Sequence, residues 1–350
     1  MNARTTSPMT TQSPRRTLSV LLVLVSISTI FLDYWEYSKS FHMDPDIWAS
    51  TLRGDNAAPT QYRIGVLKAA EFLTRHTPLA IRHALTVIDF VLLLVAVFVL
   101  RALLMRSSAW RSAGVAAQWF GAAAFVVLVQ YSLLWLTWYQ RPETITIAAL
   151  LALSLWLCTY RLPIAGAAGS ILSALCLVAL GVLQGLTRAD VGVTFHLGVA
   201  AICLTRVGKN FPLARWAQFS ASLVAAAAAA GMQFYIMRVL YPRANYGTTP
   251  MFQLLLNYTD HIRIVPFTLF VIPSVWAAVQ VARRCFSPSP AQAGLLLAAA
   301  IFICMWAVLG KIDEVRIFLP FALALAPLTV EAAMARIAAT ENVPAARNVC

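Results

Sequence analysis

Long apolar runs recur along the whole chain, and they constrain its fold more than any other feature. Each run is about 18 to 20 residues long, which as an α-helix is enough to cross the hydrocarbon core of a bilayer. Hydrophobic residues make up 60% of the 350 residues, and charged residues only 12%. A soluble fold of this length has too little interior to bury so many apolar side chains. We therefore predict an integral membrane protein.

The runs favour helices over strands. Lipid offers no partners to backbone polar groups, so only helix bundles and closed barrels span a bilayer. The long Leu-, Val- and Ala-rich runs lack the short alternating pattern of barrel strands. We predict an all-α, polytopic membrane helix bundle with about ten transmembrane helices. The predicted spans are 17–33, 79–103, 112–136, 144–160, 164–186, 191–206, 216–239, 264–282, 291–310 and 317–335.

The basic residues set the predicted orientation and domain organisation. With the N-terminus in the cytoplasm, about twice as many Lys and Arg residues fall on the inside as on the outside, once the first loop is set aside. The positive-inside rule favours this arrangement, which we expect in a bacterial inner membrane. The predicted parts are a cytoplasmic N-terminal tail (1–16), a transmembrane bundle (17–335) and a cytoplasmic C-terminal tail (336–350). The bundle includes a long first external loop (33–78), and its first span is expected to be a retained signal anchor.

The net charge of +13 does not indicate nucleic-acid binding. The Lys and Arg residues are scattered singly between apolar runs, where they anchor helix ends. We expect the lipid bilayer to be a partner and nucleic acid not to be one. The six cysteines show no CxxC or Cys/His spacing that would indicate a metal site.

The acidic residues are strongly one-sided in this topology. Eleven of the fourteen lie on the external side, whereas the internal loops contain almost none. A polar site at the outer membrane–water boundary would produce this placement. The external acids are Asp33, Glu36, Asp44, Asp46, Asp55, Glu71, Glu143, Asp190, Asp260, Asp313 and Glu314.

The first candidate cluster lies where the first span leaves the membrane. Asp33 and Glu36 are placed at this exit, and Asp44 and Asp46 follow in the same loop. A carboxylate here can act as general base for an acceptor hydroxyl, or two of them can bind Mg²⁺ or Mn²⁺. Asp44 and Asp46 are the candidate metal ligands. The alternative is that these acids only mark the wet end of a helix beside aromatic residues.

In the second part of the first loop, the spacing of the apolar residues predicts an amphipathic helix over Tyr62–Arg75. Its apolar face is formed by Tyr62, Val66, Ala69, Ala70 and Leu73. Such a helix can lie in the membrane interface. Packing on neighbouring loops is the alternative.

The second candidate cluster is distributed over four external helix starts, each with an arginine close to an acid. Arginine is suited to bind phosphate, and nearby acids hold it in position. Several such cations at one membrane face suit the phosphate of a lipid. Helix-end ion pairs are the alternative reading. The clusters comprise Arg141 with Glu143, Arg188 with Asp190, Asp260 and His261 with Arg263, and Lys311, Asp313 and Glu314 with Arg316.

One acid, Asp89, is predicted to lie within a span. An ionisable group at this depth is a functional candidate by default. Its simplest role is to pair with a cation or polar group on a neighbouring helix.

This arrangement resembles the GT-C class of membrane glycosyltransferases, which use polyprenyl-phosphate sugars. The resemblance rests on Asp33 and Glu36 at the end of the first span, on Asp44-Pro-Asp46 in a long first loop, and on the predicted interface helix that follows. The resemblance implies that Asp33, or Asp44 and Asp46, activates the acceptor, and that Arg188, Arg263 or Arg316 binds the donor phosphate.

The implied reaction moves a sugar from a lipid-linked donor to a glycan, lipid or protein acceptor at the external face. The resemblance implies no nucleotide cofactor, and a divalent cation is compatible with it. A secondary transporter or lipid-carrier translocase is an alternative, and it would place ionisable residues at mid-membrane. A polysaccharide polymerase or ligase would use similar external arginines, and a non-catalytic membrane subunit is the fourth alternative.

Overall fold

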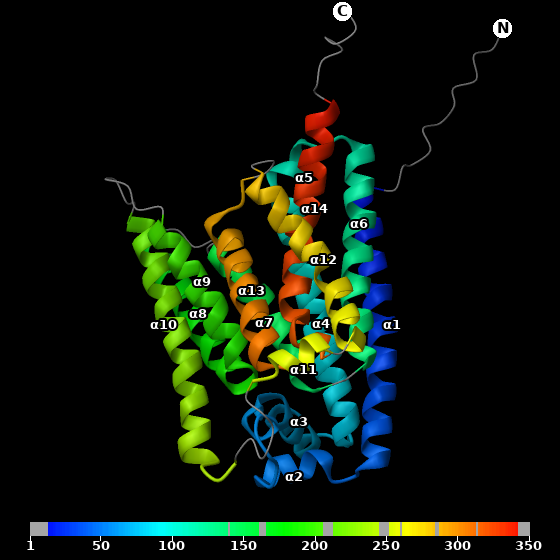
Figure 1. Cartoon of the computed structure of the whole chain (residues 1–350), viewed down its shortest axis with the longest axis vertical. Helices are drawn as coiled ribbons and strands as arrows, with labels where there is room; N and C mark the ends of the chain where they lie inside the picture. Colours follow the sequence, from blue (N-terminus) through cyan, green and yellow to red (C-terminus); the bar gives the residue numbers. More distant parts are fainter. Residues whose placement is uncertain are drawn as a thin grey trace, which may run out of the picture.

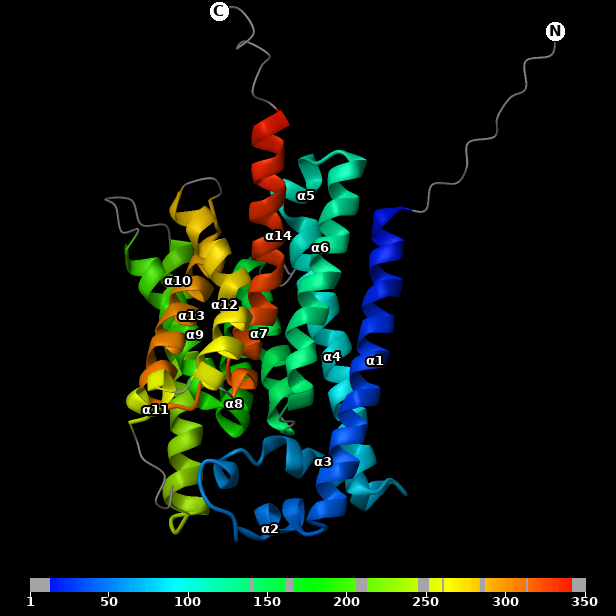
Figure 2. The same ribbon diagram turned by 45° about the vertical axis from the view of Figure 1, so that its right-hand side comes forward.

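The computed structural model describes residues 13–138, 141–160, 166–205, 213–244, 252–259, 261–283, 287–312 and 314–341. Every regular element in these residues is a helix. Long helices run side by side as a bundle, and short helices cover one of its ends (Figures 1 and 2).

Ten helices correspond to the ten predicted spans. Eight of them are long and apolar enough to cross a membrane, while α7 and α9 are shorter apolar helices of 17 residues. The prediction of a polytopic helical membrane bundle is confirmed. The ten helices are α1 (Pro14–Met43), α4 (Ile81–Arg106), α6 (Val115–Leu134), α7 (Glu143–Thr159), α8 (Gly166–Thr187), α9 (Ala189–Thr205), α10 (Leu213–Tyr235), α12 (His261–Ala282), α13 (Pro290–Leu309) and α14 (Leu319–Glu341).

Helix α1 differs from its prediction at the C-terminal end. We expected the first span to end and a loop to begin at residue 33, but the helix continues to Met43. The polar residues after Asp33 contain no helix breaker until Pro45, which disfavours helical geometry at Asp44. Polarity was therefore a poor guide to the end of this helix. Asp33 and Glu36 lie within α1 and not in a loop.

The first loop forms a small layer across one end of the bundle, between the ends of α1 and α10 (Figures 1 and 2). We call this end of the bundle the loop end. It contains α2 (Ile47–Arg53), η1 (Thr60–Tyr62) and α3 (Gly65–His76). Helix α3 matches the predicted amphipathic helix and buries Val66, Leu67 and Ala70 in a cluster with residues of α1 and α4. Ala69, which we assigned to the apolar face, is exposed.

Small residues allow the helices on the other side to approach closely. A Cβ atom on Gly181 would lie 2.4 Å from the carbonyl oxygen of Ala225, and one on Gly185 would lie 2.6 Å from that of Ala229. Helices α8 and α10 therefore pack with their backbones nearly in contact, as small residues permit in membranes.

Helix α12 contains two prolines, and the backbone hydrogen bond that one of them removes is replaced by a side-chain hydrogen bond. Pro273 has no N–H to donate to the carbonyl of Leu269. The hydroxyl of Tyr131 on α6 donates to that carbonyl at 2.7 Å. The short elements that complete the fold are α5 (Ser108–Ser112), η2 (Trp135–Trp138), η3 (a π-helical turn, Ile236–Leu240), α11 (Leu254–Thr259) and η4 (Val315–Ile317).

Candidate functional site

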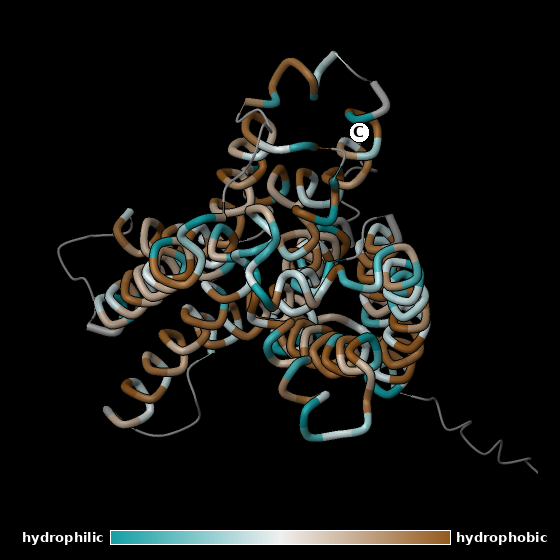
Figure 3. The backbone as a smooth tube through the Cα atoms, turned by 90° about the horizontal axis from the view of Figure 1, so that it is seen from below, coloured by the Kyte–Doolittle hydropathy of each residue, from teal (hydrophilic) through white to brown (hydrophobic). Residues whose placement is uncertain are grey.

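Buried charged residues gather at the loop end of the bundle. Figure 3 views the molecule from this end, where hydrophilic stretches lie among the helix ends and connections. The even-numbered predicted spans all begin here, because successive helices of the bundle alternate in direction. The site can be followed from α1 across α7 to α9.

Two carboxyl groups from neighbouring helices meet in the interior. Asp33 on α1 is 4% exposed, and Asp89 on α4 is fully buried. Their side chains lie within hydrogen-bonding reach of each other. The hydroxyl of Tyr37, one turn after Asp33 on the same face of α1, donates to Oδ2 of Asp89 at 2.6 Å. Two carboxyl groups this close need a shared proton or a cation between them.

Glu143 connects this pair to the arginines. It lies in the first turn of α7, where the helix dipole favours an acid, and it is buried. Nη1 of Arg63, which follows η1 in the first loop, donates to Oε1 of Glu143 at 2.7 Å. Asp89 and Arg316 both lie within electrostatic range of Glu143. The first loop is thus ion-paired to the bundle beside the two aspartates.

Arg316 in η4 contributes a second cation, which is buried. Its Nη2 donates to Oε2 of Glu314 at 2.7 Å, and its side chain is 7% exposed. Its Nε is buried and has no hydrogen-bond partner among the residues that the structure describes. Burial lowers the pKa of Arg316 to about 10, although Glu143 and Glu314 act in the opposite direction. Arg316 therefore stays charged at neutral pH and retains an unused donor.

Arg188 forms a third cationic centre, between α8 and α9. Its side chain is 2% exposed and pairs with both carboxylate oxygens of Asp190, at 2.5 and 3.3 Å. Nη1 of Arg188 donates to the carbonyl of Ile317 at 3.1 Å, which joins this centre to η4. The guanidinium also lies over the ring of Phe302. This fixed geometry suits the recognition of an oxyanion.

A cavity of about 200 Å³ lies between the first loop, the α8–α9 junction, the end of α10 and α13. Trp306 is one of its lining residues, and its buried indole Nε1 has no hydrogen-bond partner in the described part of the chain. Pockets for drug-sized ligands measure about 300–1,000 Å³, so this cavity suits a group as small as one sugar ring. Its polar and aromatic lining includes Tyr62, Arg63, Arg188, Asp190, Gln233 and Trp306.

Asp44 and Asp46 lie apart from this network, on the exposed start of the first loop. Both carboxylate oxygens of Asp46 accept hydrogen bonds from Arg53, which also bonds Asp55. The hydrogen bond from Arg53 lowers the pKa of Asp46. Among the residues that the structure describes, no three His, Cys, Asp or Glu side chains are grouped as metal ligands.

The remaining predicted residues have separate outcomes. Glu36 is half-buried on α1, and Arg141 is half-buried just before α7 and within electrostatic range of Arg316. Arg263 is half-buried in the first turn of α12 and stays a predicted phosphate ligand. Asp260, Asp313 and the side chain of His261 lie outside the described residues.

For two important contacts, the sequence did not identify the partner residue. Arg63 has no acid near it in sequence, and its partner Glu143 is 80 residues away, so no local pattern could identify the pair. We had expected a polar partner for Asp89 on a neighbouring helix, and Tyr37 is that partner. Its place one turn from Asp33 was the available signal.

Comparisons with protein-family models, with curated proteins and with solved structures found no match.

Proposed function

We propose that this protein is a membrane glycosyltransferase that moves a sugar from a polyprenyl-phosphate donor to an acceptor hydroxyl. One observation carries the proposal: buried carboxyl groups and buried arginines meet at one end of a membrane bundle, beside a cavity of about 200 Å³. Buried charges are costly in a membrane protein, and they mark functional sites there by default. The architectural resemblance to the GT-C class supports the same reaction.

Asp33 is the proposed general base. As the acceptor oxygen bonds to the anomeric carbon, its proton passes to the Asp33 carboxylate. The bond from that carbon to the phosphate oxygen breaks, and the phosphate leaves with the electron pair. Arg188 and Arg316 stabilise the growing negative charge, a term that is usually the largest in such catalysis. Asp33 is preferred over Asp44 and Asp46 because it is buried and in contact with the network.

We propose further that the loop end faces the outside of a bacterial inner membrane. Helix α1 begins and α14 ends at the opposite end, which agrees with both termini being cytoplasmic (Figure 1). The excess of basic residues predicted for that side supports the same orientation.

Transport of a lipid carrier is the second candidate, and buried polar groups within the bundle favour it. His196 bonds Gln184 at 3.1 Å, and Gln184 bonds Ser154 at 3.1 Å, all three fully buried. Polar groups at such depth occur along transport pathways. A polymerase or ligase would use the loop-end site with a lipid-linked glycan as acceptor.

The test uses purified protein in nanodiscs and a panel of polyprenyl-phosphate sugars with radiolabelled sugar. We expect label to appear in an added hydroxyl acceptor and free polyprenyl phosphate to accumulate in equal amount. No transfer from any donor, together with movement of a fluorescent polyprenyl phosphate across liposomes that contain the protein, would overturn the enzyme and support the transporter.

A further inference from the structure

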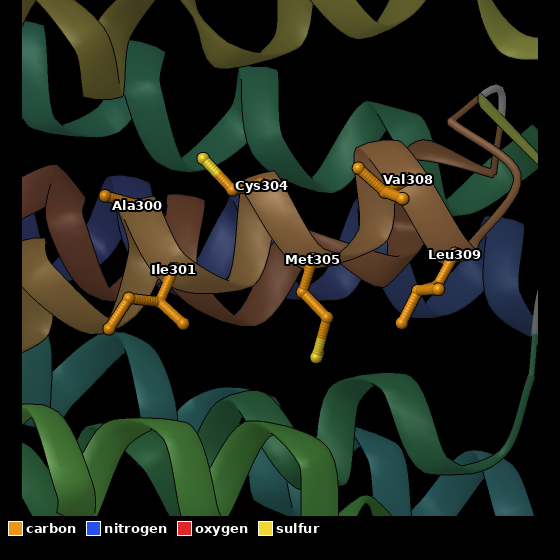
Figure 4. Close-up of a pocket in the computed structure, with 6 residues that line it drawn as sticks. All are labelled: Ala300, Ile301, Cys304, Met305, Val308 and Leu309. Carbon is orange, nitrogen blue, oxygen red and sulfur yellow. The ribbon is translucent and has the colours of Figure 1, made fainter. Parts of the chain in front are cut away.

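The outer surface and the interior of the bundle differ in where they place polar groups. Figure 4 shows an outer face of α13 whose side chains are all apolar: Ala300, Ile301, Cys304, Met305, Val308 and Leu309. The contact between α1 and α4 contains the carboxyl groups of Asp33 and Asp89 instead, and we call them the aspartate pair. Every other buried residue of α4 is Ala, Val or Leu. Two acids at such a place are costly, so they point to a function.

Helix α1 brings two groups to Asp89 from one face. Its buried residues recur every three or four positions from Leu18 to Tyr37, so Asp33 and Tyr37 are successive members of one buried stripe. The hydroxyl of Tyr37 donates to Oδ2 of Asp89 at 2.6 Å. Oδ1 of Asp89 is also buried, and no residue that the structure describes hydrogen-bonds it. A buried polar atom in this state costs free energy, so Asp89 needs a further partner.

A proton meets this need better than a metal ion. Two carboxylates within hydrogen-bonding reach repel each other unless one is neutral or a cation lies between them. Mg²⁺ and Ca²⁺ take about six or more oxygen ligands, whereas a proton joins two oxygens. Among the described residues, no third acid, His or Cys is grouped with the pair as a metal ligand. Asp89 is fully buried and Asp33 is 4% exposed, so the neutral form is favoured at Asp89.

The surrounding charges favour the same result. Glu143 on α7 lies within electrostatic range of Asp89, while Arg63 and Arg316 act on Glu143. Helix α6 has no charged residue, and those of α14 lie toward the opposite end. The other ionisable side chains around this end of α1, α3 and α4 are half-buried or exposed: Tyr34, Glu36, Lys39, His42, Lys68, Glu71, Arg75, His76, Arg82 and His83.

We propose that Asp33 and Asp89 share one proton, and that Asp89 is a positioning residue that donates this proton to Asp33 and so holds the base in place. Tyr37 in turn fixes Asp89. The positioning role rests on the proposed function, whereas the shared proton does not depend on it.

The protons of the transfer step balance as follows. Before transfer, the aspartate pair carries one proton, on Asp89, and one negative charge, on Asp33. As the acceptor oxygen bonds to the anomeric carbon, its proton passes to Asp33, and the phosphate leaves with the electron pair. The pair then carries two protons and no charge, and one proton is released to solvent before the next reaction.

Infrared spectroscopy in nanodiscs at neutral pH tests the shared proton, because it detects the C=O stretch of a protonated carboxyl group. A Glu331→Gln background keeps the acid at the opposite end from contributing. In this background Asp89→Asn should remove a protonated-carboxyl band. Asp33→Asn should keep the band but shift it, because Asp89 then donates to an amide and not to a carboxylate.

Two tyrosine variants provide a matched comparison. Tyr37→Phe removes a hydrogen bond from Asp89 and should shift the band, while Tyr34→Phe should leave it in place. The proposal would be overturned if Asp89→Asn removed no band, or if the band stayed unchanged in Asp33→Asn, whether or not the protein transfers sugar.

The kinetics of sugar transfer test the positioning role. Asp89→Leu matches the apolar residues around it on α4 but cannot donate, and it should lower kcat about 10²-fold, as a misplaced catalytic group does, with KM for the donor unchanged. Asp89→Asn still donates through its amide and should stay within about tenfold of the unmodified protein. Equal losses in both variants would overturn the positioning role. The expected band without transfer from any donor would support the shared proton and count against the proposed function.

Discussion

The two ends of the bundle bury their acids in different ways. At the loop end, Asp33, Asp89 and Glu143 lie close together, with the half-buried Arg63 and the buried Arg316 beside them. At the opposite end, Glu331 on α14 is the one buried acid among the described residues, and both of its carboxylate oxygens accept hydrogen bonds of 3.2 Å from the side-chain amide of Gln292. Two arginines close to Tyr160 there, Arg106 and Arg111, are exposed.

This difference separates a polar contact from a site. One acid and one amide can hold two helices together, and that explains the opposite end. A buried ion-pair network contributes little net stability, because desolvation offsets the attraction. The loop end contains such an ion-pair network, and several of its arginines lie around a cavity. Binding of an anionic ligand requires this arrangement. The predictions below test whether the two ends differ in this sense.

The largest effect on folding should come from the first loop. Arg63→Ala leaves Glu143 buried without its ion pair, and this should lower the free energy of unfolding by about 3–5 kcal/mol. Chemical unfolding in detergent micelles measures it. The double variant Arg63→Ala with Glu143→Ala should recover part of the loss, because no charge is then left unpaired. Equal losses in the single and double variants would contradict this explanation, because removing the unpaired charge would then recover nothing.

Removal of the Tyr37 hydroxyl should have the next largest effect. Tyr37→Phe deletes the donor to Asp89 and should cost about 1–3 kcal/mol of unfolding free energy, since a buried carboxyl loses its partner. The matched control is Tyr34→Phe, whose hydroxyl makes a longer, 3.3 Å contact with His83 and is only partly buried. A smaller loss for Tyr37→Phe than for the control would argue against a tightly held aspartate pair.

The opposite end should be more tolerant. Glu331→Gln replaces the acid with an amide of the same shape that can still accept from Gln292. We expect the free energy of unfolding to change by less than about 1.5 kcal/mol, the range of one ordinary hydrogen bond. A loss as large as that of Arg63→Ala would mean that the two ends do not differ.

The smallest effect should be a pH dependence in α2. Arg53 lowers the pKa of Asp46, so this contact stabilises the loop at pH values above the ordinary aspartate pKa of about 3.9 and is lost as the pH falls below it. Hydrogen exchange of α2 amides should therefore quicken on acidification, relative to its intrinsic rate. Asp46→Asn should remove this response, and an unchanged response in that variant would assign it to another group.

The helices could be predicted from sequence because each one carries its own apolar run. All ten appear, and the even-numbered starts meet at one end because alternating spans must return there. The contacts that make the site were not predictable in the same way. Asp33 reaches Asp89 only through the packing of α1 on α4, and Arg63 reaches Glu143 only through the fold of the first loop. The end of α1 was misplaced because polar residues can continue a helix.

The most direct test of the account compares sugar transfer by Asp33→Asn and Glu331→Gln in nanodiscs, with correct insertion checked for both. Loss of a general base should slow transfer about 10²- to 10⁴-fold in Asp33→Asn. Glu331→Gln, a neutral replacement of a buried acid at the other end, should transfer at the rate of the unmodified protein. Transfer that survives in Asp33→Asn, or that falls equally in both variants, would contradict the placement of the reaction at the loop end.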